Sequence, residues 1–100
     1  APPAGVAPRA VFTSSAAPNP FNPRIRIAWE MPRAGRLVLE VYDVRGRRVR
    51  TLVDGEVAAG PGAIMWDGAD TEGRPLASGV YFRVARTGSE RQVGKMTLVR

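Results

Sequence analysis

Residues 36–49 decide the fold class, and they read Arg36-Leu37-Val38-Leu39-Glu40-Val41-Tyr42-Asp43-Val44-Arg45-Gly46-Arg47-Arg48-Val49. Leu37, Leu39 and Val41 recur at every second position, as in a β-strand with one buried face. The strand then meets a turn, where Asp43 can accept hydrogen bonds from backbone amides and Gly46 can adopt a positive φ. The chain returns over residues 47–53. The segment therefore predicts an antiparallel hairpin, the basic unit of a small all-β domain.

The rest of the chain repeats this plan of short strands separated by turns. Gly supplies 11 of the 100 residues and Pro supplies 9, a density typical of many short strands, and no segment has helical periodicity. The pattern predicts seven strands, at residues 9–14, 24–31, 36–43, 47–53, 63–67, 80–86 and 91–99. The first is expected at a sheet edge, and the odd spacing of Val49 and Leu52 predicts a bulge. Seven such strands predict an immunoglobulin-like antiparallel β-sandwich.

The predicted core consists of the inward positions of these strands. They are Ile25, Ile27, Trp29, Leu37, Leu39, Val41, Ile64, Trp66, Val80, Phe82 and Val84. We expect Trp29 to be a core residue, the alternative being a platform for a ligand. Phe21 lies in a corner made by two Asn-Pro steps, and it is expected either to cover one end of the core or to be an exposed docking residue.

The domain organisation is simple. Residues 1–8 contain only Ala, Pro, Gly and Val, a composition that predicts an extended linker, and residues 9–100 are predicted to form one immunoglobulin-like β-sandwich domain. No apolar run approaches the ~20 residues of a membrane span, and no signal peptide is recognisable. Because the chain begins with Ala1, we expect it to be a processed product or part of a longer protein whose export signal is encoded elsewhere.

The residue types present exclude several kinds of active site. The chain has no His and no Cys, which removes the Ser-His-Asp and Cys-His nucleophiles, thiol redox chemistry and nearly all structural zinc sites. The nine acidic residues are scattered over turns and strand faces, so the sequence indicates no carboxylate pair in a pocket. We therefore predict a domain that is not an enzyme and that uses no cofactor and no small-molecule substrate.

The net charge of +6 raises the question of nucleic acid as a partner. Arg residues are spread through every strand and turn, and no basic run is interleaved with exposed aromatic residues as in single-strand binders. The sequence therefore predicts a solvated cationic surface and no nucleic-acid partner.

Residues 67–79 form the longest irregular stretch and contain the only metal candidates. Asp67, Asp70 and Glu72 provide carboxylates that calcium prefers, but they depart from the spacing D-x-[DN]-x-[DN]-G. They are weak calcium candidates, and the favoured interpretation is that the Asp and Gly residues serve turn geometry.

Six motifs follow one another along the chain. They are Asn19-Pro20-Phe21-Asn22-Pro23, Pro32-Arg33-Ala34-Gly35, residues 41–49, Trp66-Asp67-Gly68, Ser78-Gly79-Val80-Tyr81 and Lys95-Met96-Thr97-Leu98-Val99. In this order they resemble the type A C-terminal sorting domain of proteins exported by the bacterial type IX secretion system. They are also similar to the immunoglobulin-like domain of flagellar hook-capping proteins. The resemblance covers the chain from Ala17 onwards.

The resemblance implies a non-catalytic domain at the end of a larger secreted protein, covalently linked to an N-terminal cargo domain. Its implied partners are the outer-membrane secretion translocon and a cell-surface sortase that removes the domain. The implied location is secreted or on the outer-membrane surface of a Gram-negative bacterium, reached via the periplasm. That the chain ends directly after its last predicted strand agrees with this expectation.

Carried over residue by residue, the implied sorting and recognition positions are Gly35, Tyr42, Asp43, Gly46, Gly79, Tyr81 and Lys95. The Gly and Asp residues among them are explained equally well as turn requirements. The last strand is expected to be an edge that can add to a partner's sheet through main-chain hydrogen bonds.

Two other functions stay open from the sequence. One is a structural immunoglobulin-like module of a hook-capping protein or of a large surface protein. The other is a glycan-binding module in which Trp and Tyr side chains on a sandwich face stack on sugars.

Overall fold

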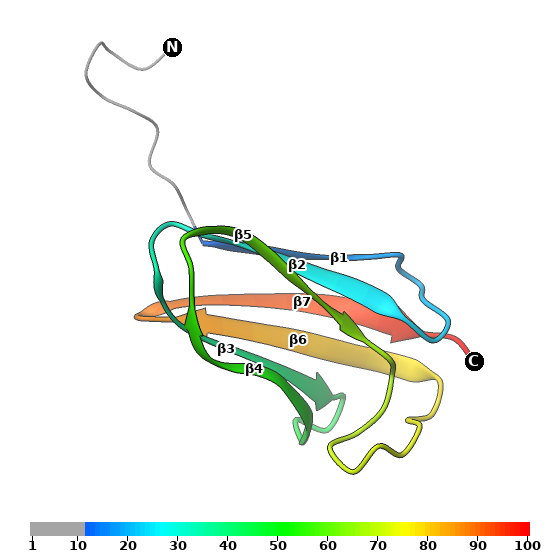
Figure 1. Ribbon diagram of the computed structural model, residues 1–100. Coiled ribbons are helices and arrows are strands. Elements are labelled where there is room, and N and C mark those ends of the chain that lie inside the picture. Colours follow the sequence, from blue (N-terminus) through cyan, green and yellow to red (C-terminus); the bar gives the residue numbers. More distant parts are fainter. Residues whose placement is uncertain (1–11) are drawn as a thin grey trace.

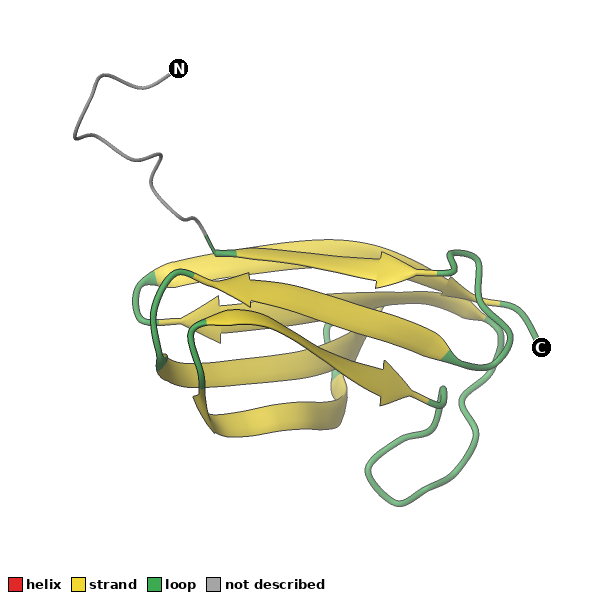
Figure 2. Ribbon diagram, turned by 45° about the horizontal axis from the view of Figure 1, so that its top comes forward, coloured by secondary structure: helices red, strands yellow, loops and turns green. Residues whose placement is uncertain are grey.

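The computed structural model describes residues 12–100, which form two packed antiparallel sheets (Figures 1 and 2). The seven strands are β1 (Thr13–Ala17), β2 (Ile25–Met31), β3 (Gly35–Asp43), β4 (Arg48–Val57), β5 (Gly60–Trp66), β6 (Gly79–Thr87) and β7 (Glu90–Leu98). One sheet has the order β1-β2-β5 and the other β4-β3-β6-β7. The prediction of an all-β immunoglobulin-like sandwich of seven strands is confirmed.

The first strand differs in position from its prediction. β1 begins at Thr13, and it is the edge of the three-stranded sheet, paired with β2 alone. The predicted linker at residues 1–8 and the first half of the predicted strand at 9–14 lie outside the described residues. Within residues 12–100 no helix is long and apolar enough to cross a membrane.

The predicted bulge occurs between β3 and β4. The pairing of these strands shifts register between Leu39 and Glu40 and again between Val41 and Tyr42. Each extra residue on β4 bends that strand, which is why Val49 and Leu52 do not keep a period of two. β4 extends to Val57, four residues beyond the predicted end at residue 53, because its second half pairs with the beginning of β3.

The core lies between the two sheets and is organised around Trp66, which is fully buried. Its ring lies 5.5 Å from the ring of Phe21 and 5.9 Å, edge to face, from the ring of Tyr81. The indole N–H of Trp66 donates to the carbonyl of Ala69 at 2.9 Å, so the buried polar atom is satisfied. The other buried residues of this cluster are Phe12, Ile25, Ile27, Met31, Leu37, Leu39, Val41, Ala85, Met96 and Leu98.

Trp29 is a partly buried residue that packs against this core, as predicted. It pairs across the strands with Gly62 on β5, and its indole ring covers that glycine. A Cβ at Gly62 would lie 2.4 Å from the indole ring, closer than real contacts allow. Only glycine at position 62 leaves room for the Trp29 ring in this place.

The prediction for β6 is wrong: Val80, Phe82 and Val84 do not face the core. Tyr81 and Ala85 are the inward residues, and Val84 is buried on the outer face between Glu40 and Val93. β6 is a central strand with apolar residues at successive positions, so alternation alone does not choose its inner face.

The side of the sandwich between β1 and β7 is closed by an inward arginine. Arg83 extends over Gly94, where a Cβ would come within 2.2 Å of the guanidinium carbon, and it reaches Ser14 on β1. Burial lowers the pKa of Arg83 from its ordinary value. Its aliphatic stem fills space between the sheets while its charged head reaches the edge.

Phe21 covers one end of the core, as the first of its two interpretations expected. It is 1% exposed, and its backbone forms a short parallel bridge with β7. Phe21 donates to the carbonyl of Thr97 and accepts from the amide of Val99, both at 2.9 Å. The side chain of Asn19 adds two bonds to β7, accepting from the amide of Thr97 at 2.9 Å and donating to the carbonyl of Lys95 at 3.0 Å.

The last strand, β7, is an edge of its sheet, as expected, but these contacts occupy the second half of that edge. From Lys95 to Val99, the main-chain groups at the edge of the sheet already form hydrogen bonds with the segment from Asn19 to Phe21. A partner strand cannot add along this half without displacing that segment.

Candidate recognition surface on the four-stranded sheet

The structure separates the seven sequence-derived recognition candidates into three places. Tyr42, Asp43, Gly46 and Lys95 lie on, or at the end of, the outer face of the four-stranded sheet. Gly79 and Tyr81 belong to the beginning of β6, and Gly35 lies at the other end of β3.

Cross-strand pairing places an apolar group on this outer face. Tyr42 on β3 pairs with Phe82 on β6, which pairs with Lys95 on β7. In the neighbouring row Val84 pairs with Val93. Because alternate residues of a strand share a face, these five side chains lie on the same side of the sheet.

A groove of about 490 Å³ opens on this face. Its lining consists of Tyr42, Asp43, Val44, Gly46, Phe82, Val84, Arg91 and Val93. Val44 is 68% exposed and Val93 is 54% exposed, two of the four large apolar side chains exposed in residues 12–100. We call this groove together with Lys95 the recognition surface. Its combination of exposed apolar and cationic groups is typical of a protein-binding site.

Glu40 lies on this face beside Val84, and its negative charge is neutralised by ion pairs with Arg48 and Arg86. It is only 3% exposed and accepts from Tyr42 Oη at 3.2 Å, Arg48 at 3.0 Å and Arg86 at 2.8 Å. Burial alone raises the pKa of Glu40, but the hydrogen bonds from Arg48, Tyr42 and Arg86 outweigh burial and hold the pKa below its ordinary value. The carboxylate therefore remains ionised and orders Tyr42 at the edge of the groove.

Two cations of the recognition surface have no such compensation. Arg91 and Lys95 make no ion pair with any residue in the range 12–100. They are exposed on β7, on either side of Val93. The free charge of this surface is therefore positive.

Asp43 and Gly46 build the turn that borders the groove. One oxygen of Asp43 accepts from the amides of Arg45 at 2.9 Å and Arg47 at 3.0 Å, and the other accepts from Arg47 Nε at 3.1 Å. The backbone hydrogen bond from Arg47 is the main cause that lowers the pKa of Asp43. Gly46 adopts a φ of +80°, a conformation that favours glycine. The turn interpretation of these two residues thus has a direct structural basis, and the turn presents Val44 to the groove.

Tyr81 and Gly79 have structural roles. Tyr81 is 7% exposed and donates its hydroxyl to the carbonyl of Ala77 at 2.7 Å. Desolvation raises the pKa of Tyr81 above its ordinary value. Gly79 has a φ of +157° at the first position of β6. Neither residue contributes to the recognition surface.

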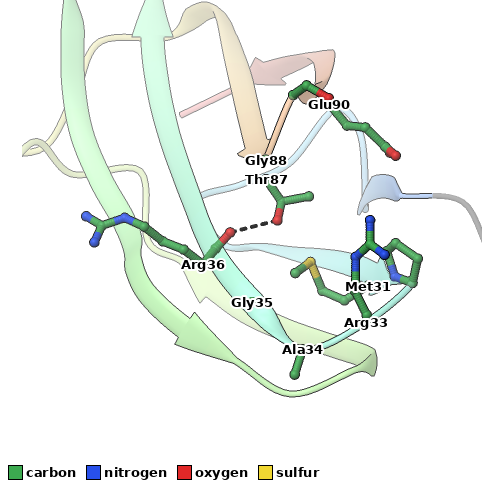
Figure 3. Close-up of a pocket in the computed structure, with 10 residues that line it drawn as sticks. Met31, Arg33, Ala34, Gly35, Arg36, Thr87, Gly88 and Glu90 are labelled. Carbon is green, nitrogen blue, oxygen red and sulfur yellow. Dashed lines mark hydrogen bonds between the residues drawn. The ribbon is translucent and has the colours of Figure 1, made fainter.

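Gly35 lines a separate pocket of about 330 Å³ at the far end of β3 (Figure 3). The pocket lies between the turn after β2 and the turn before β7, and Thr87 Oγ1 joins the two walls by donating to the carbonyl of Arg36 at 2.7 Å. Gly35 has no positive φ, and a Cβ there would meet nothing within 4 Å. Its backbone conformation and its packing therefore do not require glycine, in contrast to Gly46.

The weak calcium candidates do not converge. Across residues 12–100 no three acidic side chains are grouped so that they could hold a metal ion. Asp70 accepts from the amides of Glu72 and Arg74 at 2.9 Å each, and both Asp70 and Glu72 form ion pairs with Arg74. Asp67 accepts from the amide of Ala69 at 3.1 Å and lies 3.6 Å from Arg50. The carboxylates serve turn geometry and ion pairs.

Comparison with known proteins places the fold in a family. Residues 21–90 match the family model described as the FlgD Ig-like domain. The chain belongs to this family. No curated protein sequence matches it.

Solved structures share the fold of this family member. PorU from Porphyromonas gingivalis, a dimeric latent form, matches 95% of the chain with a TM-score of 0.66 and 22% identity. PorZ from the same organism, an essential bacterial surface component of its type IX secretion system, matches 87% with a TM-score of 0.63 and 17% identity. The chain spans only about a tenth of these proteins, 10% of PorU and 11% of PorZ.

Two FlgD structures are similar at 25% identity and cover 84% of the chain. FlgD from P. aeruginosa has a TM-score of 0.60, and the match spans 63% of that protein. FlgD from Xanthomonas campestris, which takes part in hook capping, has a TM-score of 0.58, and the match spans 60% of it. A similar immunoglobulin-like fold is therefore found both in FlgD proteins and in PorZ, a component of the type IX secretion system.

Sequence reasoning missed part of the recognition surface. The strand pattern predicts Phe82 and Val84 in the core and does not distinguish Arg91 or Val93 from their neighbours. The alternation of Arg91, Val93 and Lys95 was the available signal, because two charged residues on one strand face indicate that the valine between them faces solvent.

Proposed function

We propose that this chain is a non-catalytic sorting domain that directs a covalently linked N-terminal cargo protein through the type IX secretion system to the bacterial cell surface. The observation that carries the proposal is the recognition surface. It combines Tyr42 and Lys95, both sorting candidates from the sequence motifs, with an exposed apolar groove on the outside of a complete core. A partner can bind such a surface while the domain stays folded.

In this proposal the outer-membrane translocon recognises the folded domain. Strand addition along β7 is disfavoured over its second half because the segment from Asn19 to Phe21 occupies that edge. A cell-surface sortase then removes the domain from its cargo, which has travelled via the periplasm. The domain itself performs no catalysis and binds no cofactor, nucleic acid or small-molecule substrate.

A secretion assay tests the proposal. Residues 9–100 are fused to a periplasmic reporter in a Gram-negative host that has the type IX system, and the reporter is measured in the periplasm, on the cell surface and in the medium. We expect surface or medium reporter with the wild-type fusion and in the Met65→Glu control, because Met65 is exposed on the other sheet. Reporter retained in the periplasm with the wild-type fusion contradicts the proposal.

A second function is favoured by a specific observation, the family match together with 25% identity to two FlgD proteins. A structural module of hook-capping type would act as a spacer. The same assay separates the two functions, since a spacer function predicts that the reporter stays in the periplasm with the wild-type fusion and with Lys95→Glu alike.

A further inference from the structure

The last strand carries a regular pattern on its outward face. Arg91, Val93 and Lys95 are alternate residues of β7, so all three side chains lie on the outer side of the sheet. At about 3.4 Å per residue, the two cations lie roughly 14 Å apart along the strand. Val93, which is 54% exposed, lies midway between them.

The apolar part of the surface continues from Val93 toward β3. Val93 pairs with Val84, and Phe82 and Tyr42 form the next row. The groove that these residues line has a volume of about 490 Å³, more than one side chain of a partner needs. A partner residue placed over Val93 therefore has apolar surface on which to pack.

The charges of the surface define the rest of the partner. Arg91 and Lys95 make no ion pair within residues 12–100, whereas the nearby acids are engaged: Glu40 with Arg48 and Arg86, and Asp43 with Arg47. No acid of this surface thus competes for the two cations. Carboxylates of a partner complement them.

We infer that the recognition surface binds an extended segment of a partner protein in which two acidic residues, four positions apart, flank a central apolar residue. In an extended segment residues 1, 3 and 5 share one face and span the same distance as Arg91 to Lys95. The inference deepens the proposed function, because it names the chemistry that the translocon would present to this domain.

Titration with a short peptide tests the inference. The probe is the acetylated, amidated peptide Asp-Thr-Leu-Thr-Glu, added to the isotope-labelled 100-residue chain at low salt and followed by amide chemical shifts. We expect shifts concentrated at Tyr42, Phe82 and Val93 and absent at Met65. The peptide Asp-Leu-Thr-Thr-Glu, with the leucine turned to the opposite face, is expected to bind several-fold more weakly, and Lys-Thr-Leu-Thr-Lys not to bind.

Charge variants provide the second readout. The double variant Arg91→Glu, Lys95→Glu is expected to lower the affinity for the probe peptide at least about fivefold, since each exposed ion pair contributes modestly to binding. Arg26→Glu, on the outer face of the other sheet, is the matched control and is expected to leave affinity unchanged. Raising salt to 0.5 M should weaken binding because these charges are exposed.

The outcomes separate this inference from the proposed function. An absence of shifts, shifts spread over both sheets, or equal affinity of the double variant and wild type overturns the inference. The titration needs no secretion system, so peptide binding by a domain whose fusion stays in the periplasm refutes the sorting function alone. Export of the fusion without peptide binding refutes the inference alone.

Discussion

Asp43 and Asp70 hold their turns through the same set of hydrogen bonds. In each turn one carboxylate oxygen accepts from the amides two and four residues later, and the other accepts from the Nε of the arginine four residues later. A glycine with φ near +80° occupies the position before that arginine in both, Gly46 at 80° and Gly73 at 82°. The Asp-x-x-Gly-Arg pattern is thus one local structure used twice, and the second copy bonds to β4 where Thr71 donates to the carbonyl of Val49 at 3.0 Å.

The shared geometry predicts matching responses to substitution. Asp43→Ala and Asp70→Ala should each lower the melting temperature, because the amides that the carboxylate satisfies lose their partner. Asp→Asn at either position should cost less, since one amide oxygen still accepts both backbone bonds. Circular dichroism melts of the four variants measure this, and an alanine variant as stable as wild type contradicts the assigned role.

Glu40 should make stability depend on acid pH. The pKa of Glu40 in the folded state lies below its ordinary value of 4.5, so its contribution is present above that value and is lost as pH falls through the folded pKa. Glu40→Gln should cost about 1–3 kcal/mol at pH 7, a range moderated by the half-exposed Arg48 and Arg86.

Urea unfolding at pH 7 and at pH 3 measures this effect. The difference in free energy of unfolding between wild type and Glu40→Gln should shrink at pH 3. Asp43 and Asp70 are present in both proteins, so their own pH dependence cancels in this difference. A difference that does not change with pH would show that the charge of Glu40 is not what stabilises the sheet.

The two glycines of the β3 ends should respond in opposite ways. Gly46→Ala should lower the free energy of unfolding by about 1–2 kcal/mol, because a φ of +80° strains any residue with a Cβ. Gly35→Ala should leave it unchanged or raise it by up to about 1 kcal/mol, because its φ and its surroundings accept a Cβ.

Chemical denaturation of both glycine variants gives the comparison. If Gly35→Val also keeps full stability yet reduces export in the secretion assay, the pocket at Gly35 is used by a partner. A large destabilisation by Gly35→Ala would contradict the open geometry of this pocket.

Substitutions at successive residues of β6 should lower the free energy of unfolding by very different amounts. Tyr81→Ala removes a ring buried against Trp66 and should cost about 3–5 kcal/mol, whereas Tyr81→Phe loses one hydrogen bond and should cost about 1 kcal/mol. Phe82→Ala, on the outer face, should cost less than Tyr81→Ala. Equal costs at positions 81 and 82, measured by denaturant unfolding, would contradict the orientation of this strand.

Much of the fold follows from local patterns. The alternation of Ile25, Ile27 and Met31 in β2 and of Leu37, Leu39 and Val41 in β3 assigned their inner faces correctly, because their other faces carry charged residues. The turn at residues 43–46 was also predicted, because it is held by hydrogen bonds between residues only a few positions apart in the sequence.

The sequence by itself thus determined the number of strands, the turn at residues 43–46 and the sandwich class, because alternation and turn residues act through neighbours along the chain. The tertiary structure decided the inner face of β6, the covering of β7 by the segment from Asn19 to Phe21, and the grouping of Tyr42 with Val93. β6 is apolar on both faces, so only its pairing with β3 and β7 and the opposing sheet select which face is buried. Contacts between residues more than 70 positions apart, such as Asn19 to Thr97, have no signature in local periodicity.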